Sequence, residues 1–186
     1  ISVWAYNNNG DWFWVDGVCK RQDMARNIDD LFRLNAKYRP ISVGIEVSGQ
    51  QQGFISIIQE RMGRTSNWFT LASNENSNQP GIRPNTNKLQ RFNVVVPWFK
   101  AGKMYFPIEH KHEAPLMEMM DELKLASVGG FKSKHDDAVD TISMLASMKP
   151  FKPSEESTQL SWEDGNIWDQ KVDDGWGDSG LNSYLP

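Results

Sequence analysis

The sequence predicts an α/β domain with a mixed sheet, and three observations support this prediction. A β-rich stretch and an aromatic stretch lie on either side of Asn7-Asn8-Asn9-Gly10, as in a hairpin of two antiparallel strands. Helical and strand-like patterns then alternate along the chain, which is typical of parallel strands joined by crossover helices. The strand-like segment 41–47 is almost entirely apolar, as strands in a sheet interior are.

Each element is predicted from its own pattern. Strand-like residues fill 1–6 and 11–19 on either side of the turn. Apolar residues then recur at helical spacing from Asp23 to Tyr38, and Pro40 marks the end of that helix. The sequence further predicts, in chain order, a strand at 41–47, a helix at 51–62, a strand at 68–72, a polar loop at 73–87, a helix at 88–100, a strand at 104–106, a helix at 112–124 and a helix that follows the acidic stretch 134–140.

Charge divides the chain into a body and a tail. We expect residues 1–150 to form the folded domain and residues 151–186 to form a flexible acidic tail. The formal net charge is −4, but the tail carries eight acidic residues against two lysines, so the body is mildly basic. This asymmetry predicts a body that binds a polyanion. The tail is expected to be disordered, to occupy the basic path as a polyanion mimic, or to dock to a partner through Trp162, Trp168 and Trp176.

Several classes of protein are excluded by composition. Cys19 is the single cysteine, so it cannot form an internal disulfide, and no Cys/His set has zinc spacing. No apolar run is long enough to span a bilayer, and no secretory signal is visible at the N-terminus. These features predict an intracellular protein that is not inserted in a membrane.

The stretch Lys134-His135-Asp136-Asp137-Ala138-Val139-Asp140 places three carboxylates at the start of a helix. Residues three and four apart share a helix face, so Asp140 lies on one face with both Asp136 and Asp137. Acidic residues in a first helical turn complement the helix dipole, which accounts for two of them. The third, Asp140, stands beside an apolar stripe and is expected to be partly buried. Such crowded carboxylates favour a divalent ion with oxygen ligands, Mg²⁺ or Mn²⁺.

Glu46 is the carboxylate that we expect to pair with this cluster. It lies near the C-terminal end of an apolar predicted strand, where an ionised side chain is costly unless it is paired or bound to metal. Ligands collect at the carboxyl ends of strands in open α/β sheets. A Glu that simply reaches solvent at a strand end is the structural alternative. Glu46 and the Asp cluster together would form an all-oxygen cage suited to two-metal phosphodiester hydrolysis.

These motifs, in this order, resemble the nuclease domain of the large terminase subunits that package DNA in tailed double-stranded DNA bacteriophages. Glu46 in Val-Gly-Ile-Glu-Val resembles the second acidic motif of that family, and residues 135–140 resemble its C-terminal acidic motif. The stretch from Lys88-Leu89-Gln90-Arg91 to Phe106-Pro107 is similar to a family segment with Lys-x-x-Arg, a Phe, a Gly and a short strand that ends in Phe-Pro. The resemblance covers about residues 1–148.

The resemblance implies an RNase H-like mixed sheet with helices on both faces. It implies an endonuclease that uses Mg²⁺ or Mn²⁺, with two ions expected, to cut concatemeric double-stranded DNA during genome packaging in the cytoplasm of the infected bacterial host. Glu46 and Asp137 would ligate metal, with Asp136 or Asp140 completing the cage. Lys88, Arg91, Lys132 and Lys134 flank the motifs and are the predicted contacts to DNA phosphates, although a single residue of this kind is more often a solvated surface charge than a DNA ligand.

The family also has an Asp on the first strand of its sheet, and this chain departs from that pattern. Residues 1–6 carry no acid and correspond best to the second strand, while Asp11 and Asp16 lie at the hairpin turn and on its far side. We therefore expect the first strand and its Asp upstream of Ile1, which leaves the site of this chain incomplete. No phosphate-loop motif occurs, so an ATPase domain is expected upstream as well, with the portal and the small terminase subunit as further partners.

Two alternatives remain open. One is a Holliday-junction resolvase or a transposase-type nuclease with the same fold, which preference for branched over linear DNA would identify. The other is a nucleic-acid-binding module that is not an enzyme and whose carboxylates are structural. Such a module would not be stabilised by Mn²⁺.

Overall fold

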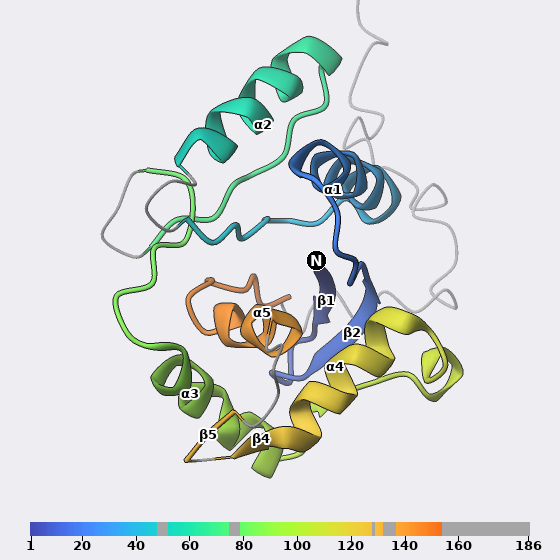
Figure 1. The fold of residues 1–186 in the computed structure, drawn as a ribbon, viewed down its shortest axis with the longest axis vertical. Coiled ribbons are helices and arrows are strands. Elements are labelled where there is room, and N and C mark those ends of the chain that lie inside the picture. Colours follow the sequence, from blue (N-terminus) through green and yellow to red (C-terminus); the bar gives the residue numbers. More distant parts are fainter. Residues whose placement is uncertain (48–51, 75–78, 128, 132–136, 154–186) are drawn as a thin grey trace, which may run out of the picture. The chain divides into compact units, whose positions relative to one another are not determined.

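The computed structural model describes residues 1–47, 52–74, 79–127, 129–131 and 137–153. The chain divides into a compact unit, Ile1–Lys152, and a remainder, Pro153–Pro186. All described elements belong to the first unit, which is mixed α/β with a small mixed sheet and five α-helices (Figure 1). Almost all of the predicted acidic tail lies outside the described residues. Every helix within the described ranges is too short or too polar to cross a membrane.

The main sheet has three strands in the order β1 (Ser2–Tyr6), β2 (Trp12–Gly17) and β3 (Met104–Tyr105). β1 and β2 form the predicted antiparallel hairpin, in which Tyr6 lies opposite Trp12. Its turn is closed by the Asn7 side chain, which accepts a hydrogen bond of 2.8 Å from the Asp11 N–H, and by Gly10, whose φ of 82° suits a residue without Cβ. β3 pairs with β2 in parallel, so the mixed character of the sheet is confirmed.

The helices match their predicted positions to within a few residues. α1 (Met24–Tyr38) begins after Asp23, whose carboxylate accepts from the Arg26 N–H, and α3 (Lys88–Lys100) begins after Asn87, which caps it in the same way. The remaining helices are α2 (Gln52–Thr65), the 3₁₀ turn η2 (Ile108–His110), α4 (Ala114–Leu125) and α5 (Asp137–Leu145). A two-stranded hairpin of β4 (Ala126–Ser127) and β5 (Gly130–Phe131), which the sequence did not predict, precedes α5.

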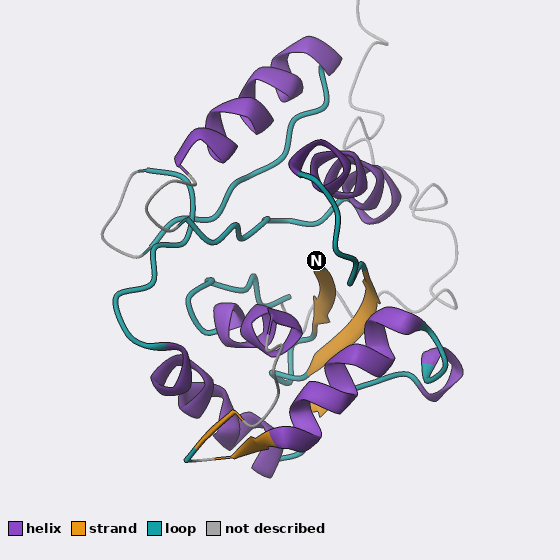
Figure 2. Cartoon of the chain, viewed as in Figure 1, coloured by secondary structure: helices purple, strands orange, loops and turns teal. Residues whose placement is uncertain are grey.

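The predicted strands 41–47 and 68–72 are not continuous strands, and this corrects the prediction. The two segments run beside each other as loops, joined by one parallel bridge between Val43 and Leu71 (Figure 2). Two further parallel bridges join Glu46 to Ile82 and Ser73 to Gly81. Segment 41–47 has a strand-like neighbour on one side only within the described residues, so its apolar residues are mostly half-buried and not interior.

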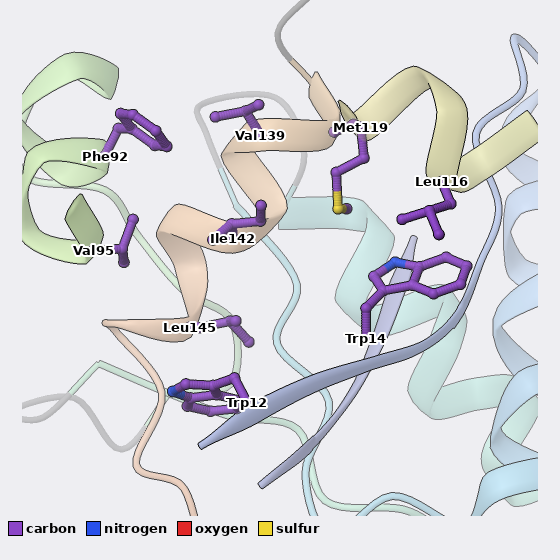
Figure 3. Packing of buried hydrophobic residues seen from close by; sticks show 10 residues of the cluster. Trp12, Trp14, Phe92, Val95, Leu116, Met119, Val139, Ile142 and Leu145 are labelled. Carbon is purple, nitrogen blue, oxygen red and sulfur yellow. The ribbon is translucent and has the colours of Figure 1, made fainter. Parts of the chain in front are cut away.

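Buried side chains form two separate clusters. The larger lies between the β1–β2 hairpin and α3, α4 and α5; Figure 3 shows Val139, Ile142 and Leu145 of α5 at its centre. The second joins α1 and α2 to segments 43–45 and 69–71, with Ile58 fully buried. A cavity of about 570 Å³ is lined by members of both groups, including Trp4 and Leu145 from the first and Leu31, Val43 and Ile45 from the second. β1 and segment 41–46 form two of its walls.

Candidate active site

Glu46 and Asp140, which are far apart in the sequence, lie next to the same guanidinium group. The Arg91 Nη2 atom lies 2.6 Å and 2.9 Å from the two carboxylate oxygens of Asp140, and 3.7 Å from the Glu46 Oε2 atom. The Lys88 Nζ atom lies 3.6 Å from Asp140 on the same side. The structure therefore brings together four residues that the sequence singled out, two as metal ligands and two as phosphate contacts.

Local structure explains how each of the four is positioned. Lys88 and Arg91 occupy the first turn of α3, directly after its Asn87 cap. Asp140 occupies the first turn of α5, and α5 packs against α3 through the buried residues of the larger cluster (Figure 3). Glu46 is held by its parallel bridge to Ile82, where the Ile82 N–H donates to the Ile45 carbonyl at 2.7 Å.

Glu46 and Asp140 would repel each other if no positive charge, from a side chain or a metal ion, lay beside them. The side chain of Asp140 is 14% exposed and that of Glu46 is 29% exposed, so both carboxylates have lost much of their water. Burial raises the pKa of Glu46, and the neighbouring charge and hydrogen bonding of Asp140 raise it further. The charges of Arg91 and Lys88 act in the opposite direction and favour the ionised form.

Asp137 lies near this group but in a different environment. Its side chain is 90% exposed, and the Lys88 Nζ atom lies 3.9 Å from its carboxylate. Its proximity to Lys88, shared with Asp140, agrees with the predicted helix face. The predicted ligand Asp136 and the predicted DNA contacts Lys132 and Lys134 lie outside the described residues.

The donor chemistry of Glu46 and Asp140 fits Mg²⁺ or Mn²⁺ in kind, because both ions prefer carboxylate oxygens. The charge of Asp140 raises the pKa of Glu46, and such an ion would neutralise this repulsion between the two carboxylates. Within the described ranges, no three His, Cys, Asp or Glu side chains are grouped as a metal site. The pair alone offers fewer oxygen donors than either ion takes.

The two acids near the hairpin are held elsewhere, as expected. The Asp11 carboxylate accepts from Lys103 at 2.7 Å and from the Asn7 side chain at 2.9 Å. The Asp16 carboxylate accepts from Tyr38 at 2.7 Å and from Lys37 at 3.0 Å. Both carboxylates therefore have structural partners of their own near the hairpin.

Sequence reasoning missed two features of the site. It assigned Arg91 to DNA alone, although Arg91 also neutralises the carboxylates, and its buried Nε has no hydrogen-bond partner among the described residues. It also overlooked Glu122, which is buried on α4 and accepts a hydrogen bond from α5. A signal for Glu122 was present, because it follows Leu116 and Met119 at helical spacing on the apolar stripe.

Comparisons of this chain with family models, with curated proteins and with solved structures give no match.

Proposed function

We propose that this chain is the nuclease domain of a terminase large subunit, an RNase H-like, metal-dependent endonuclease that cuts concatemeric viral DNA. The observation that carries the proposal is the half-buried pair of Glu46 and Asp140 with Arg91 and Lys88 beside it. Two carboxylates and two cations from three separate segments are what a phosphodiester-cleaving site requires for metal and for phosphate. They also belong to the three segments whose motifs resemble that family.

The cavity beside β1 supports the finer part of the proposal, an RNase H-like sheet with one more strand. β1 pairs with β2 on one side, and its other side faces the cavity. Val43, Ile45 and Val47 direct their backbone groups toward residues 70–82, so those of Gly44 and Glu46 alternate toward the cavity. An extended apolar strand would fit between these two edges. An Asp on that strand would lie near Glu46 and add the third carboxylate.

The residues of the site have distinct roles in this scheme. Glu46 and Asp140 would hold the ion, with Asp137 or Asp136 as a further donor. The ion, when bound, would stabilise negative charge on the scissile phosphate and activate water. Arg91 and Lys88 would then lose their present carboxylate partners to the metal and turn to the DNA backbone. The unpaired Nε of Arg91 gives that guanidinium an unused donor for a phosphate oxygen.

The proposed function also implies partners and a cellular compartment. An upstream ATPase domain, the portal and the small terminase subunit would be the partners, and the host cytoplasm would be the compartment.

Thermal unfolding with increasing Mn²⁺ tests the site in the chain as it is. We expect Mn²⁺ to raise the Tm of the wild-type chain, and Glu46→Gln and Asp140→Asn each to abolish the rise. Asp121→Asn is the matched control, because Asp121 is an exposed carboxylate that pairs only with Lys124 among the contacts described. A rise that survives in both site variants would show that the ion binds elsewhere.

Plasmid cleavage tests the activity and needs a version with the additional strand. We expect Mg²⁺- or Mn²⁺-dependent cutting that is lost in the Glu46→Ala and Asp140→Ala variants. Cleavage that survives both substitutions would overturn the assignment. Linear duplex and four-way junctions should be compared in the same assay, because preference for junctions would point to a resolvase instead.

A second candidate, a nucleic-acid-binding module that is not an enzyme, is favoured by one observation. Arg91 and Lys88 already neutralise the carboxylates, so the cluster is stable as an ion-pair network without metal. Such a module would bind DNA with a salt dependence but would show no rise in Tm with Mn²⁺. The titration above therefore separates the two candidates.

A further inference from the structure

Glu122 is a buried carboxylate that the proposed chemistry does not use. It lies on α4 and is 4% exposed, in the midst of the apolar residues that α4 directs toward α5. A carboxylate in such a place is costly unless its oxygens are hydrogen-bonded. Met119 and Leu116, one and two turns earlier on the same face, show that this face otherwise carries apolar residues.

The partners of Glu122 are the first backbone N–H groups of α5. The Val139 N–H donates to the Glu122 Oε2 atom at 2.8 Å, in a bond that is itself buried. Burial raises the pKa of Glu122, and hydrogen bonds from the N–H groups of Val139 and Ala138 act against that rise. These donors have no acceptor within α5, because the first N–H groups of a helix never do. Glu122 therefore caps α5 from a different helix.

The capped turn is the one that carries the site. α5 begins at Asp137, so the two bonded N–H groups lie between Asp137 and Asp140. The side chain of Val139 packs in the larger core cluster, and its N–H is fixed by Glu122. These two contacts fix the position of the first turn along the helix axis and its rotation about that axis. The same turn presents Asp140 to Glu46 and Arg91.

We propose that Glu122 is a positioning residue for the carboxylate site, holding the first turn of α5 so that Asp140 meets Glu46. The inference rests on the proposed function for the metal, and on geometry alone for the position of Asp140. Substituting a residue that orients metal ligands without binding the metal itself typically weakens metal affinity by about tenfold to a hundredfold.

Two variants and a capping control test the inference. Glu122→Met keeps the size of the side chain and removes both acceptor oxygens, whereas Glu122→Gln keeps one. Asp23→Ala removes the cap of α1, away from the site, and so reports the effect of losing a helix cap in general. All three variants should have a lower Tm than the wild type.

Only the Glu122 variants should change the site. We expect the Mn²⁺ concentration for half-maximal stabilisation to rise about tenfold or more in Glu122→Met. It should rise by a smaller factor in Glu122→Gln, and it should stay unchanged in Asp23→Ala. Where Glu122→Met does not fold, Glu122→Gln carries the test. An unchanged midpoint in the folded variants would overturn the inference.

A measurement without metal separates this inference from the proposed function. The NMR resonance of the Arg91 side-chain Nε–H reports the position of Asp140 through the shared guanidinium group, because the Nη2 atom of that group binds both Asp140 oxygens. We expect it to move in the Glu122 variants and to stay in place in Asp23→Ala. A wild-type chain that does not respond to Mn²⁺ would contradict the proposed function. An unmoved Arg91 resonance in Glu122→Met or Glu122→Gln would contradict the positioning role.

Discussion

Arg91 is the residue on which the metal-free site depends. Its guanidinium contacts both oxygens of Asp140 and lies within 3.7 Å of Glu46, and its own side chain is largely buried. Removing one partner of a buried ion pair leaves an uncompensated charge, which is more destabilising than the pair itself is stabilising. Asp140 and Glu46 repel each other, so without Arg91 both would depend on the more distant charge of Lys88 alone.

Arg91→Ala should therefore lower the free energy of unfolding at neutral pH by about 2 kcal/mol, less than for a fully buried pair because Glu46 keeps some water. Chemical denaturation without divalent ions measures the loss. Arg33→Ala is the control, since the pair of Arg33 with Asp30 is more exposed and should cost less than about 1 kcal/mol. Equal losses in the two variants would mean that Arg91 does not neutralise the site.

At this scale the sequence predicted that Glu46 and Asp140 belong together, and the structure places both next to Arg91. The partial burial of Asp140 followed from its place beside an apolar stripe, and the structure confirms it. The second role of Arg91 could not be predicted, because the approach of α3 to α5 depends on packing between distant residues such as Val95 and Ile142. The choice between Asp136 and Asp137 stays open, since Asp136 lies outside the described residues.

Among the elements, α5 connects the core to the site. Its buried face, with Val139 and Ile142 fully enclosed, lies between α3 and α4, and its first turn carries Asp140 (Figure 3). Loosening this helix should weaken both the fold and the site.

Ile142→Ala should lower the free energy of unfolding by about 3 kcal/mol, because it removes buried methyl groups and leaves a cavity. Met117→Ala on α4 is the comparison, because Met117 is exposed and its truncation should cost little. Urea unfolding measures both losses. A loss in Ile142→Ala as small as that in Met117→Ala would contradict the packing described for α5.

A second prediction concerns the contact between β2 and the end of α1. Burial opposes the ionisation of Asp16, but hydrogen bonds from Tyr38, Lys37 and the Gly17 N–H together lower its pKa. A carboxyl with a lowered folded-state pKa stabilises the protein above its unfolded pKa, near 4, and loses that contribution as the pH falls through the folded value. Asp16→Asn should thus cost about 1 kcal/mol at pH 7 and progressively less below about pH 4.

Urea titrations of the wild type and of Asp16→Asn at pH 7 and at pH 3 measure this change. A difference in unfolding free energy that stays constant between the two pH values would rule out the ionised Asp16 as its source. Asp29→Asn is a suitable control, because Asp29 is an exposed carboxylate whose pair with Arg61 should contribute little.

The predicted helices were confirmed where helical periodicity and a capping residue indicated the same helix start. Asp23 and Asn87 both cap helices that begin at the next residue. The segment Val94-Val95-Val96 stays helical in spite of its β-branched residues, because Val95 is fully buried against α5. Segment 41–47 has a strand-like composition but forms only single bridges, since a strand needs partners that composition does not supply.

Taken as a whole, the first unit has two hydrophobic clusters and a large cavity that residues of both clusters line. This cavity is partly open to solvent, so the apolar residues that line it lack the close packing of a protein interior. The sequence could not predict the cavity, because each wall is an ordinary amphipathic element and the void arises only from their arrangement. The two β edges that face it lack partners on that side within the described residues. A strand in this position would join the two clusters into one core.

Fusing a designed strand ahead of Ile1 tests this arrangement. The added segment would be a short apolar strand with one Asp near its end, joined to β1 through an Asn-Gly turn. Burying three or four apolar side chains in the cavity, less the cost of ordering the strand, should add about 2 kcal/mol, or a Tm increase of about 5 °C. A Gly/Ser-rich extension of equal length should leave the Tm unchanged.

The Asp of the added strand should act on the metal site, while its apolar residues act on the fold. We expect the Asp version to bind Mn²⁺ at least about tenfold more tightly than the unextended chain, because it brings a third carboxylate near Glu46 and Asp140. The same strand with Asn in place of Asp should keep the increase in Tm and lose the gain in affinity. Thermal unfolding across a Mn²⁺ series measures both effects. If the Gly/Ser-rich extension stabilises the chain as much as the apolar strand does, the cavity does not accept a strand. If the Asp and Asn versions bind Mn²⁺ equally, the added Asp does not form a metal site with Glu46 and Asp140.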